Sequence, residues 1–340
     1  MWFSRKKATL NVRVFGKTDT GRQREHNEDA FLVADLTAKI ASLKPEVREH
    51  AVGDRGSLFL VADGMGGAAA GEIASEMAAE TIYQHLVDTW ANDKDVTPTQ
   101  FAFRLREAVE LANAKIHEHA QQHPERRGMG TTTTTVGVLN DSIYLANVGD
   151  SRAYLIRGGE ATQITKDQSL MQRLVDAGEL TEEEAEKSER RNIILQALGP
   201  EPNVRVDLTH QELRRGDVMV VCSDGLSGQV AKEDIATAVN ASQDPVDTCA
   251  RLIDIANERG GPDNITVVVA HFDGEAIQPV GPDDATVGHR IFPMADTDSD
   301  TEPVPAYREP PPEAPQHRAR MIVAALASAL ILIASLLLAA

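Results

Sequence analysis

Residues 58–67 read LFLVADGMGG, an apolar run that ends in Asp63 followed by a glycine. Consecutive apolar residues that include aromatic and β-branched side chains are typical of a buried strand. A glycine beside the carboxylate lets the backbone approach a ligand closely, so Gly64 could offer its carbonyl oxygen. Taken alone, an Asp-Gly pair after a strand is usually just a turn. The pattern becomes informative because it recurs elsewhere in the chain.

Three further carboxylates lie at the ends of predicted strands. Residues 218–224 read VMVVCSD, residues 143–150 read IYLANVGD, and Asp263 stands just before the apolar run 265–270. If these strands are neighbours, the carboxylates meet at one edge of a sheet. Carboxylates this close repel one another unless cations neutralise them. Mg²⁺ and Mn²⁺ prefer oxygen ligands, and two such ions can activate a water and clamp a phosphoryl group.

Other patterns indicate the fold class. Residues 131–138 form another β-type run, and apolar residues recur at helical spacing within 78–86 and 105–116. The predicted strands fall before, between and after the helices rather than in strict alternation. This order favours an α+β domain, with sheets covered by helices, over a doubly wound parallel sheet. The charged region 169–198 is expected to form an exposed helical insertion at the domain edge.

Composition divides the 340 residues into four parts. Residues 1–11 form a basic N-terminal segment that no apolar stretch follows, so no signal peptide is expected. Residues 12–273 have the sequence pattern of a globular domain. Residues 274–320 contain nine of the sixteen prolines and several acidic clusters, which predicts a flexible linker. Residues 321–340 carry no charge, and at ~1.5 Å per residue they match the roughly 30 Å core of a bilayer, which predicts one C-terminal transmembrane helix.

Charge and cysteine content narrow the classes of function. The net charge of −18 argues against non-specific nucleic-acid binding, which needs excess cations to displace counterions. The same charge means that any phosphorylated substrate would have to be attracted locally, by metal ions or by placed arginines. The two cysteines, Cys222 and Cys249, are too few for a disulfide framework and lack metal-ligand spacing. Cys222 ends an apolar run, so we expect a buried thiol in a reducing compartment.

The motifs and their order resemble the type-2C (PPM) family of metal-dependent protein serine/threonine phosphatases. Six segments carry the resemblance in the order found in that family: residues 21–29 (GRQREHNED), 61–67, 130–132, 147–152, 223–226 and 262–264. The flap region of bacterial members corresponds to about 164–198, with Gln168 where many relatives carry histidine. The resemblance covers about residues 12–272. It implies a β-sandwich of two antiparallel sheets flanked by helices.

The resemblance also implies roles for the carboxylates. Asp63 would bridge two Mn²⁺ or Mg²⁺ ions, with the carbonyl oxygen of Gly64 on one of them. Asp224 and Asp263 would hold the other ion. Asp150 would belong to a weaker third metal site that shares Asp224.

Three residues of the first motif receive roles in the same way. Glu28 and Asp29 would act largely through metal-bound waters, and Arg24 would bind the phosphate with its planar fork of donors. Arg22 is the rival if the register slips, but the four-residue offset from Glu28 favours Arg24. Met65 stands where eukaryotic members place a histidine proposed as general acid. Protonation of the leaving group would then come from a metal-bound water or another group.

The implied reaction is hydrolysis of phosphoserine and phosphothreonine in proteins by a metal-bridged hydroxide, opposing a bacterial-type Ser/Thr kinase. One rival is a non-catalytic membrane-bound sensor, against which the intact Asp63, Asp224 and Asp263 argue. A second rival is a phosphohydrolase acting on a small metabolite. We expect a single-pass protein of the inner membrane with its catalytic domain in the cytosol, because the basic residues within 317–320 favour the cytoplasmic face.

Overall fold

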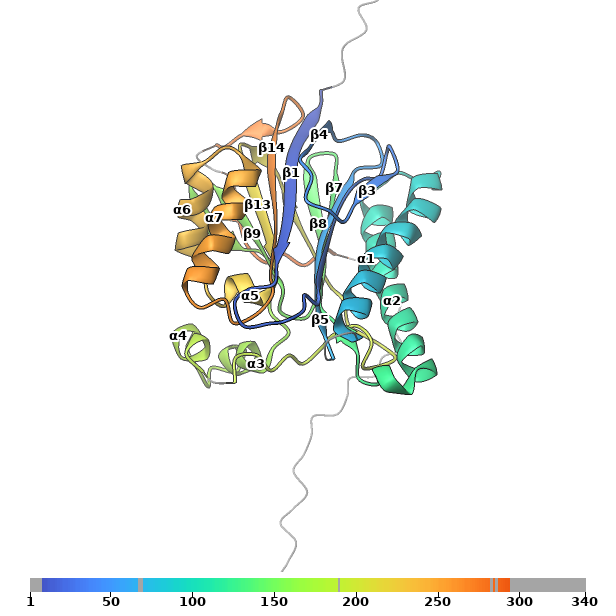
Figure 1. Cartoon of the computed structure of the whole chain (residues 1–340). Coiled ribbons are helices and arrows are strands. Elements are labelled where there is room, and N and C mark those ends of the chain that lie inside the picture. Colours follow the sequence, from blue (N-terminus) through green and yellow to red (C-terminus); the bar gives the residue numbers. More distant parts are fainter. Residues whose placement is uncertain (1–7, 67–69, 189, 282–283, 285–286, 294–340) are drawn as a thin grey trace, which may run out of the picture. The chain divides into compact units, whose positions relative to one another are not determined.

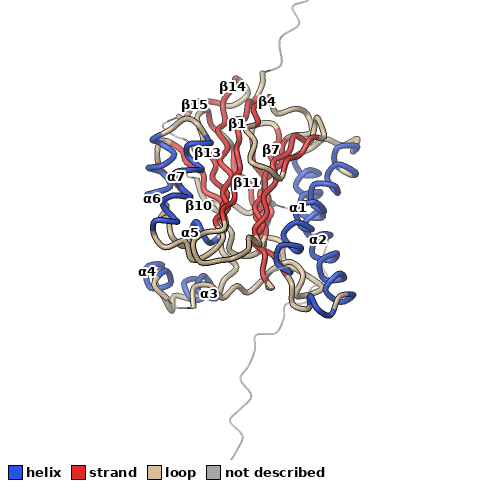
Figure 2. The backbone as a smooth tube through the Cα atoms, viewed as in Figure 1, coloured by secondary structure: helices blue, strands red, loops and turns tan. Residues whose placement is uncertain are grey.

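The computed structural model describes residues 8–66, 70–188, 190–281, 284 and 287–293. Two antiparallel sheets lie face to face in the middle of this part of the chain, and helices cover their outer faces (Figures 1 and 2). The predicted α+β sandwich of two antiparallel sheets flanked by helices is thus confirmed.

Six strands form the first sheet. They are β1 (Leu10–Asp19), β4 (Arg48–Ala51), β9 (Arg152–Arg157), β10 (Glu160–Gln163), β13 (Val218–Cys222) and β14 (Ile265–Gly274). Their order across the sheet is β10-β9-β13-β14-β1-β4. β1 and β14 pair along their whole length, so the first and last long strands of the sandwich stabilise each other.

Seven strands form the second sheet. They are β2 (Asp29–Asp35), β3 (Ile40–Ser42), β5 (Ser57–Met65), β6 (Gly130–Thr131), β7 (Thr133–Leu139), β8 (Ser142–Val148) and β11 (Asp207–Glu212). The order is β11-β8-β7-β5-β2-β3, with β6 paired to the end of β5. The central strand β5 is the apolar run that ends in the first Asp-Gly pair.

The core lies between the sheets and is filled from both. Phe31 and Phe59 of the second sheet belong to the same buried cluster as Leu155 and Phe272, which come from the first. Full burial of each such side chain stabilises the fold by about 1.5–3 kcal/mol. Cys222 is also buried, as expected, and lies in a second cluster on the outer face of the first sheet.

Helices close the two outer faces. α1 (Ala70–Asp88) and α2 (Pro98–Gln122) pack on the second sheet, as their predicted helical spacing requires. The outer face of the first sheet is covered by α5 (Asp224–Ser227), α6 (Lys232–Ala241) and α7 (Pro245–Glu258). None of these three helices was predicted from the sequence.

The flap is a short helical segment at the carboxylate end of the sandwich. It contains α3 (Leu170–Asp176) and α4 (Glu182–Glu186), which lie below α5 in Figure 1. Thr181 caps α4 and exchanges hydrogen bonds with Glu184 in a capping box. The region is thus an insertion at the domain edge, as expected.

The packed domain continues past the boundary predicted at residue 273. β15 (Gln278–Pro279) pairs in parallel with β12 (Arg214–Arg215). Further along, the backbone N–H of Phe292 donates to the carbonyl oxygen of Leu208 at 2.9 Å. The described domain therefore ends at about residue 293.

The rest of the predicted linker, residues 294–320, and the predicted transmembrane helix, residues 321–340, lie outside the described residues, as do residues 1–7. Among the helices that the structure describes, none combines the length and the apolar character needed to cross a bilayer.

Candidate metal and phosphate site

The register of β13 brings three of the predicted carboxylates to one end of the first sheet. Cys222, the last residue of β13, pairs with the first residue of β9 on one side and with a residue near the start of β14 on the other. Asp224 therefore emerges beside Asp150, which precedes β9, and beside Asp263, which precedes β14. The convergence expected from the sequence is present.

Asp63 reaches the same place from the second sheet. It lies within β5 rather than after it, because the strand continues to Met65, and it pairs directly with Asp29 at the start of β2. Seven of the eight predicted site residues line one cavity of about 460 Å³: Arg24, Glu28, Asp63, Gly64, Asp150, Asp224 and Asp263. Asp29 is the eighth, and it lies beside Asp63 in the sheet.

The electrostatics of this cluster are unfavourable without cations. Burial raises the pKa of Asp63 well above its usual range, and repulsion from Asp29 and Asp224 adds to the effect. Burial likewise raises the pKa of Asp29 to about 7 and that of Asp150 to about 8. One buried carboxyl oxygen of Asp29, Oδ2, has no hydrogen-bond partner among the described residues. Carboxylates in such a setting fit bound divalent cations, which would neutralise them.

The coordination of such ions needs more than side-chain carboxylates. Among the described Asp, Glu, His and Cys side chains, no three are gathered closely enough to hold an ion by themselves. Mg²⁺ typically takes one or two carboxylates and completes its shell with waters and other oxygens. Gly64 lines the cavity, and a Cβ there would lie 2.3 Å from the carbonyl oxygen of Gly71 and 2.4 Å from that of Glu28. Only glycine lets the backbone line the cavity at this point.

Asn264 holds the loop that carries the first motif. Its side-chain oxygen accepts a hydrogen bond from the backbone N–H of Glu28 at 2.8 Å. Its side-chain nitrogen donates to the carbonyl oxygens of Thr20 at 3.0 Å and His26 at 2.9 Å. The loop that bears Arg24 is therefore fixed over the carboxylates by one amide, a role that the sequence did not predict.

Arg24 faces the cavity, and Arg22 does not. The Nη2 atom of Arg24 donates to Asp263 Oδ2 at 2.8 Å, and this hydrogen bond raises the pKa of the guanidinium. The side chain is 55% exposed, so it keeps donors for a ligand. Arg22 is exposed and lies outside the set of residues lining the cavity. The placement favours Arg24 as the phosphate-binding residue.

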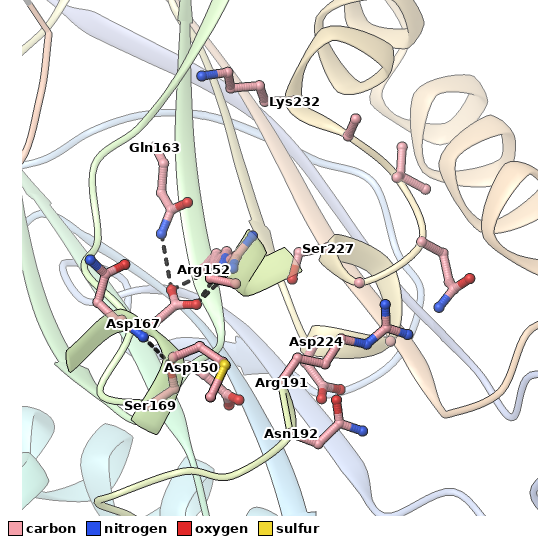
Figure 3. A pocket seen from close by; sticks show the side chains of 18 of the residues that line it. Asp150, Arg152, Gln163, Asp167, Ser169, Arg191, Asn192, Asp224, Ser227 and Lys232 are labelled. Carbon is pink, nitrogen blue, oxygen red and sulfur yellow. Dashed lines mark hydrogen bonds and ion pairs between the residues drawn. The ribbon is translucent and has the colours of Figure 1, made fainter. Parts of the chain in front are cut away.

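Gln168 attaches the start of the flap to the carboxylate loop. Its backbone N–H donates to the carbonyl oxygen of Gly149 at 2.8 Å, and its side-chain oxygen accepts from the N–H of the same glycine at 3.0 Å. Next to it, Arg152 forms a two-pronged ion pair with Asp167, at 2.7 Å between Nη2 and Oδ2 (Figure 3). Gly149, which precedes Asp150, is thus held to the flap by Gln168, the position where many relatives carry histidine.

Two threonines, Thr131 and Thr132, form hydrogen bonds to the backbone of Asp63 close to the C-terminal end of the flap. The hydroxyl of Thr131 donates to the backbone carbonyl of Asp63 at 2.9 Å, and the N–H of Asp63 donates to the hydroxyl of Thr132 at 3.1 Å. Thr131 also exchanges two backbone hydrogen bonds with Leu198, where the flap returns to the domain. The predicted strand over this threonine run is divided into β6 and β7 by a break at Thr132, and the hydroxyls of Thr131 and Thr132 hold the backbone of Asp63.

Comparison with known proteins is consistent with this site. A sequence profile of the family described as Protein phosphatase 2C matches residues 47–265. The serine/threonine protein phosphatase PstP of Mycobacterium tuberculosis is 37% identical over 278 residues, which is 81% of this chain and 48% of PstP. A putative protein phosphatase 2C-type of Streptococcus pyogenes is 35% identical over 268 residues, 78% of this chain and 100% of that protein. The chain thus spans about half the length of the mycobacterial relative.

Solved structures agree in fold as well as in sequence. The structure of the M. tuberculosis serine/threonine phosphatase PstP superposes with a TM-score of 0.65 at 36% identity, covering 77% of this chain and 99% of that one. The serine/threonine phosphatase of S. agalactiae gives 0.66 at 37% identity, covering 76% and 98%. The PstP catalytic domain in complex with two manganese ions gives 0.63 at 37% identity, covering 78% and 100%.

Proposed function

Because the chain belongs to the protein phosphatase 2C family, we propose that it hydrolyses phosphoserine and phosphothreonine in proteins with two bound divalent metal ions. The observation that carries the proposal is the gathering of seven predicted residues around one acidic cavity with an arginine at its edge. The names of the relatives support it, since both are called protein phosphatases. Manganese is the ion bound to the catalytic domain of PstP.

The carboxylates divide between the ions as the resemblance implies. Asp63 would be shared, Gly64 would add its carbonyl oxygen to one ion, and Asp224 with Asp263 would hold the other. Asp150 would contribute to a third, weaker site. When bound, the ions neutralise charge on the phosphoryl oxygens and activate a water for attack on phosphorus.

The other residues orient the reactants. Arg24 would present its N–H donors to the phosphoryl oxygens, where a planar guanidinium matches two oxygens at once. Glu28 and Asp29 would accept hydrogen bonds from waters around the ions. Asn264 keeps the loop of Arg24 in place, because it binds the backbone on both sides of it.

The proposed activity predicts a metal requirement that can be tested on the purified chain. Chelation with EDTA should abolish release of phosphate from a phosphothreonine peptide and from p-nitrophenyl phosphate, and added Mn²⁺ should restore both. The reason is that the buried carboxylates need cations before they can accept a phosphoryl group. Failure to hydrolyse either compound with Mn²⁺ would favour a non-catalytic sensor. Turnover of small sugar phosphates without turnover of the peptide would favour a metabolite phosphohydrolase.

We further propose that residues 321–340 anchor the protein in the inner membrane, with the domain in the cytosol opposing a bacterial Ser/Thr kinase. Support comes from the length and uncharged character of this segment and from the basic residues before it. The predicted linker would tether the domain flexibly to the membrane surface.

Removal of residues 321–340 should release the protein from membranes without inactivating it. A chain that ends before Met321 is expected in the soluble fraction with unchanged turnover of a phosphopeptide, whereas the full chain should sediment with membranes. The physical reason is that an apolar segment of this length partitions into a bilayer. Fractionation with an activity assay measures both effects. Digestion of the domain by protease added outside intact spheroplasts would contradict the cytosolic orientation.

A further inference from the structure

The loop that carries Asp150 crosses from one sheet of the sandwich to the other. β8 belongs to the second sheet and β9 to the first, so residues 149–151 span the gap between the two sheets. Asp63 lies near the end of β5 in the second sheet, and both carboxylates line the cavity of about 460 Å³. The position of Asp150 relative to Asp63 therefore depends on the contacts that hold this loop.

Thr132 contacts Asp63 and also both chain neighbours of Asp150. Its hydroxyl accepts a hydrogen bond from the N–H of Asp63 at 3.1 Å, and its own N–H donates to the carbonyl oxygen of Asp63 at 2.9 Å. The same hydroxyl is hydrogen bonded to the hydroxyl of Ser151 at 2.7 Å. A Cβ on Gly149 would lie 2.6 Å from Cγ2 of Thr132, so the backbone of this glycine lies directly against the threonine. One side chain thus joins the strand of Asp63 to the residues before and after Asp150.

The contact between the two hydroxyls is shielded from water. Ser151 is 0% exposed and Thr132 is 2% exposed. Among the described residues, Thr132 is the only hydrogen-bond partner of the Ser151 hydroxyl. The carbonyl oxygen of the same serine accepts a hydrogen bond from the hydroxyl of Thr134 at 2.7 Å. Loss of one partner in such a buried pair is costly, because water cannot take its place.

The charges around the cavity give this contact a mechanical role. Carboxylates that lie close together repel one another whenever the ions are absent. The repulsion pushes the loop of Asp150 away from the strand of Asp63, and the hydroxyl contact opposes this displacement. Residues that orient metal ligands through hydrogen bonds typically change metal affinity or activity by roughly 10–100-fold when they are replaced.

We propose that Ser151 and Thr132 are positioning residues that hold Asp150 in a fixed place relative to Asp63, and so couple the weaker third metal site to the two-ion centre. The inference rests on the proposed phosphatase activity and on the roles of the two carboxylates in it. The Ser151 hydroxyl acts only on the loop of Asp150, whereas Thr132 also holds the backbone of Asp63. The two residues should therefore have different effects when they are replaced.

Ser151→Ala removes the link and leaves the hydrogen bonds between Thr132 and Asp63. In the full chain this variant should keep two tightly bound ions and bind the third Mn²⁺ about tenfold more weakly. At limiting Mn²⁺, kcat for a phosphothreonine peptide should fall roughly three- to tenfold with KM unchanged, the effect of one lost hydrogen bond. The electron paramagnetic resonance signal of unbound Mn²⁺ counts the bound ions independently of activity, and calorimetry measures the affinity of the tight ones.

Replacement of Thr132 tests the connection to the two-ion centre. Thr132→Val keeps the shape of the side chain but removes both the link to Ser151 and the acceptor for the N–H of Asp63. This variant should therefore weaken the tight ions as well as the third. Thr132→Ser keeps the hydroxyl and should recover most of the tight affinity that Thr132→Val loses. An equal Mn²⁺ affinity in the valine and serine variants would contradict a role for the hydroxyl.

Thr135→Val is the matched control. Thr133 and Thr135 form a second buried pair of hydroxyls, 2.9 Å apart, in β7. The control removes one hydroxyl from such a pair without changing a contact to the loop of Asp150. A loss of stability caused by a missing buried hydrogen bond should therefore appear in thermal unfolding of both variants, and a change in Mn²⁺ binding only in Ser151→Ala.

A double-mutant cycle with Asp150→Asn tests whether Ser151 acts through Asp150. Once the carboxylate is neutralised, the loop no longer carries the ligand that Ser151 positions. Ser151→Ala should therefore lower turnover no further in the Asp150→Asn background, a strongly non-additive result. A residue that only stabilises the fold would give additive losses.

The outcomes separate this inference from the proposed function. Additive losses in the double variant, equal binding of the third ion by wild type and Ser151→Ala, or equal changes in Mn²⁺ binding in Thr135→Val would overturn the inference and leave the phosphatase activity intact. A wild-type chain that binds two ions and no third would overturn it as well. A chain that neither binds Mn²⁺ nor hydrolyses the peptide would overturn the proposed function, and the inference with it.

Discussion

Replacing Asp63 by asparagine is expected to lower kcat/KM for a phosphothreonine peptide by at least about 10³-fold, because the metal charge that activates water is worth several kcal/mol. Asp63 is the only predicted carboxylate ligand contributed by a strand of the second sheet, and burial together with two neighbouring carboxylates raises its pKa. Asparagine keeps the shape and the backbone hydrogen bonds to Thr131 and Thr132, so the fold should persist. Steady-state kinetics, Mn²⁺ titration calorimetry and thermal unfolding measure these three properties.

Asp150 provides the internal comparison. It lines the same cavity, but a role in a weaker third site means that Asp150→Asn should retain two tightly bound ions and lose only about tenfold in turnover. Loss of the tight sites in calorimetry would contradict this placement. For Asp63→Asn, wild-type turnover with a normal Mn²⁺ requirement would remove Asp63 from the metal centre.

Much of the sandwich could be predicted because its strands are continuous apolar runs. The runs that became β5, β8, β13 and β14 were recognised from β-branched and aromatic content alone. α7 was not predicted, although Asp244 caps it and Pro245 occupies its first turn, which are local signals of a helix start. The end of the domain could not be placed from local pattern, since contacts such as Arg214 with Asp284, 2.6 Å apart, join segments far apart in sequence.

The candidate site, too, could be predicted from the sequence only in part. Its carboxylates could be predicted because each lies at or beside the end of a strand, and strand ends in neighbouring positions converge. The residues that position those carboxylates could not be predicted. Asn264 and Gln168 act through hydrogen bonds to backbone atoms of distant loops, and nothing in the spacing of their own segments indicates those partners. The ion pair of Arg24 with Asp263 joins two predicted site residues, yet the pairing itself required the fold.

Replacing Arg24 by alanine is expected to raise KM for phosphopeptides and to lower kcat/KM by roughly 10–100-fold, the effect of losing a charge-assisted hydrogen bond. The guanidinium lines the cavity and is half exposed, so it can contact phosphate in both the ground state and the transition state. For Arg24→Lys, kcat/KM should fall between the values of the wild type and of Arg24→Ala, because lysine keeps the charge and loses the planar fork of donors. Kinetics at saturating Mn²⁺ measure the effect.

Arg22→Ala is the control, and metal affinity decides between two roles for Arg24. The backbone N–H of Arg22 donates to the carbonyl oxygen of Gly261 at 2.8 Å, and its side chain forms no hydrogen bond or ion pair with any residue that the structure describes, so truncation of this side chain should change KM little. Since Arg24 donates to Asp263, a purely structural role would instead appear in Arg24→Ala as altered Mn²⁺ affinity with an unchanged KM at saturating metal. If Arg24 binds phosphate, Arg24→Ala should instead raise KM at saturating metal and leave the Mn²⁺ affinity unchanged. If Arg22→Ala had the larger effect on KM, the register of the first motif would have to shift by two residues, and Arg22 would be the phosphate ligand.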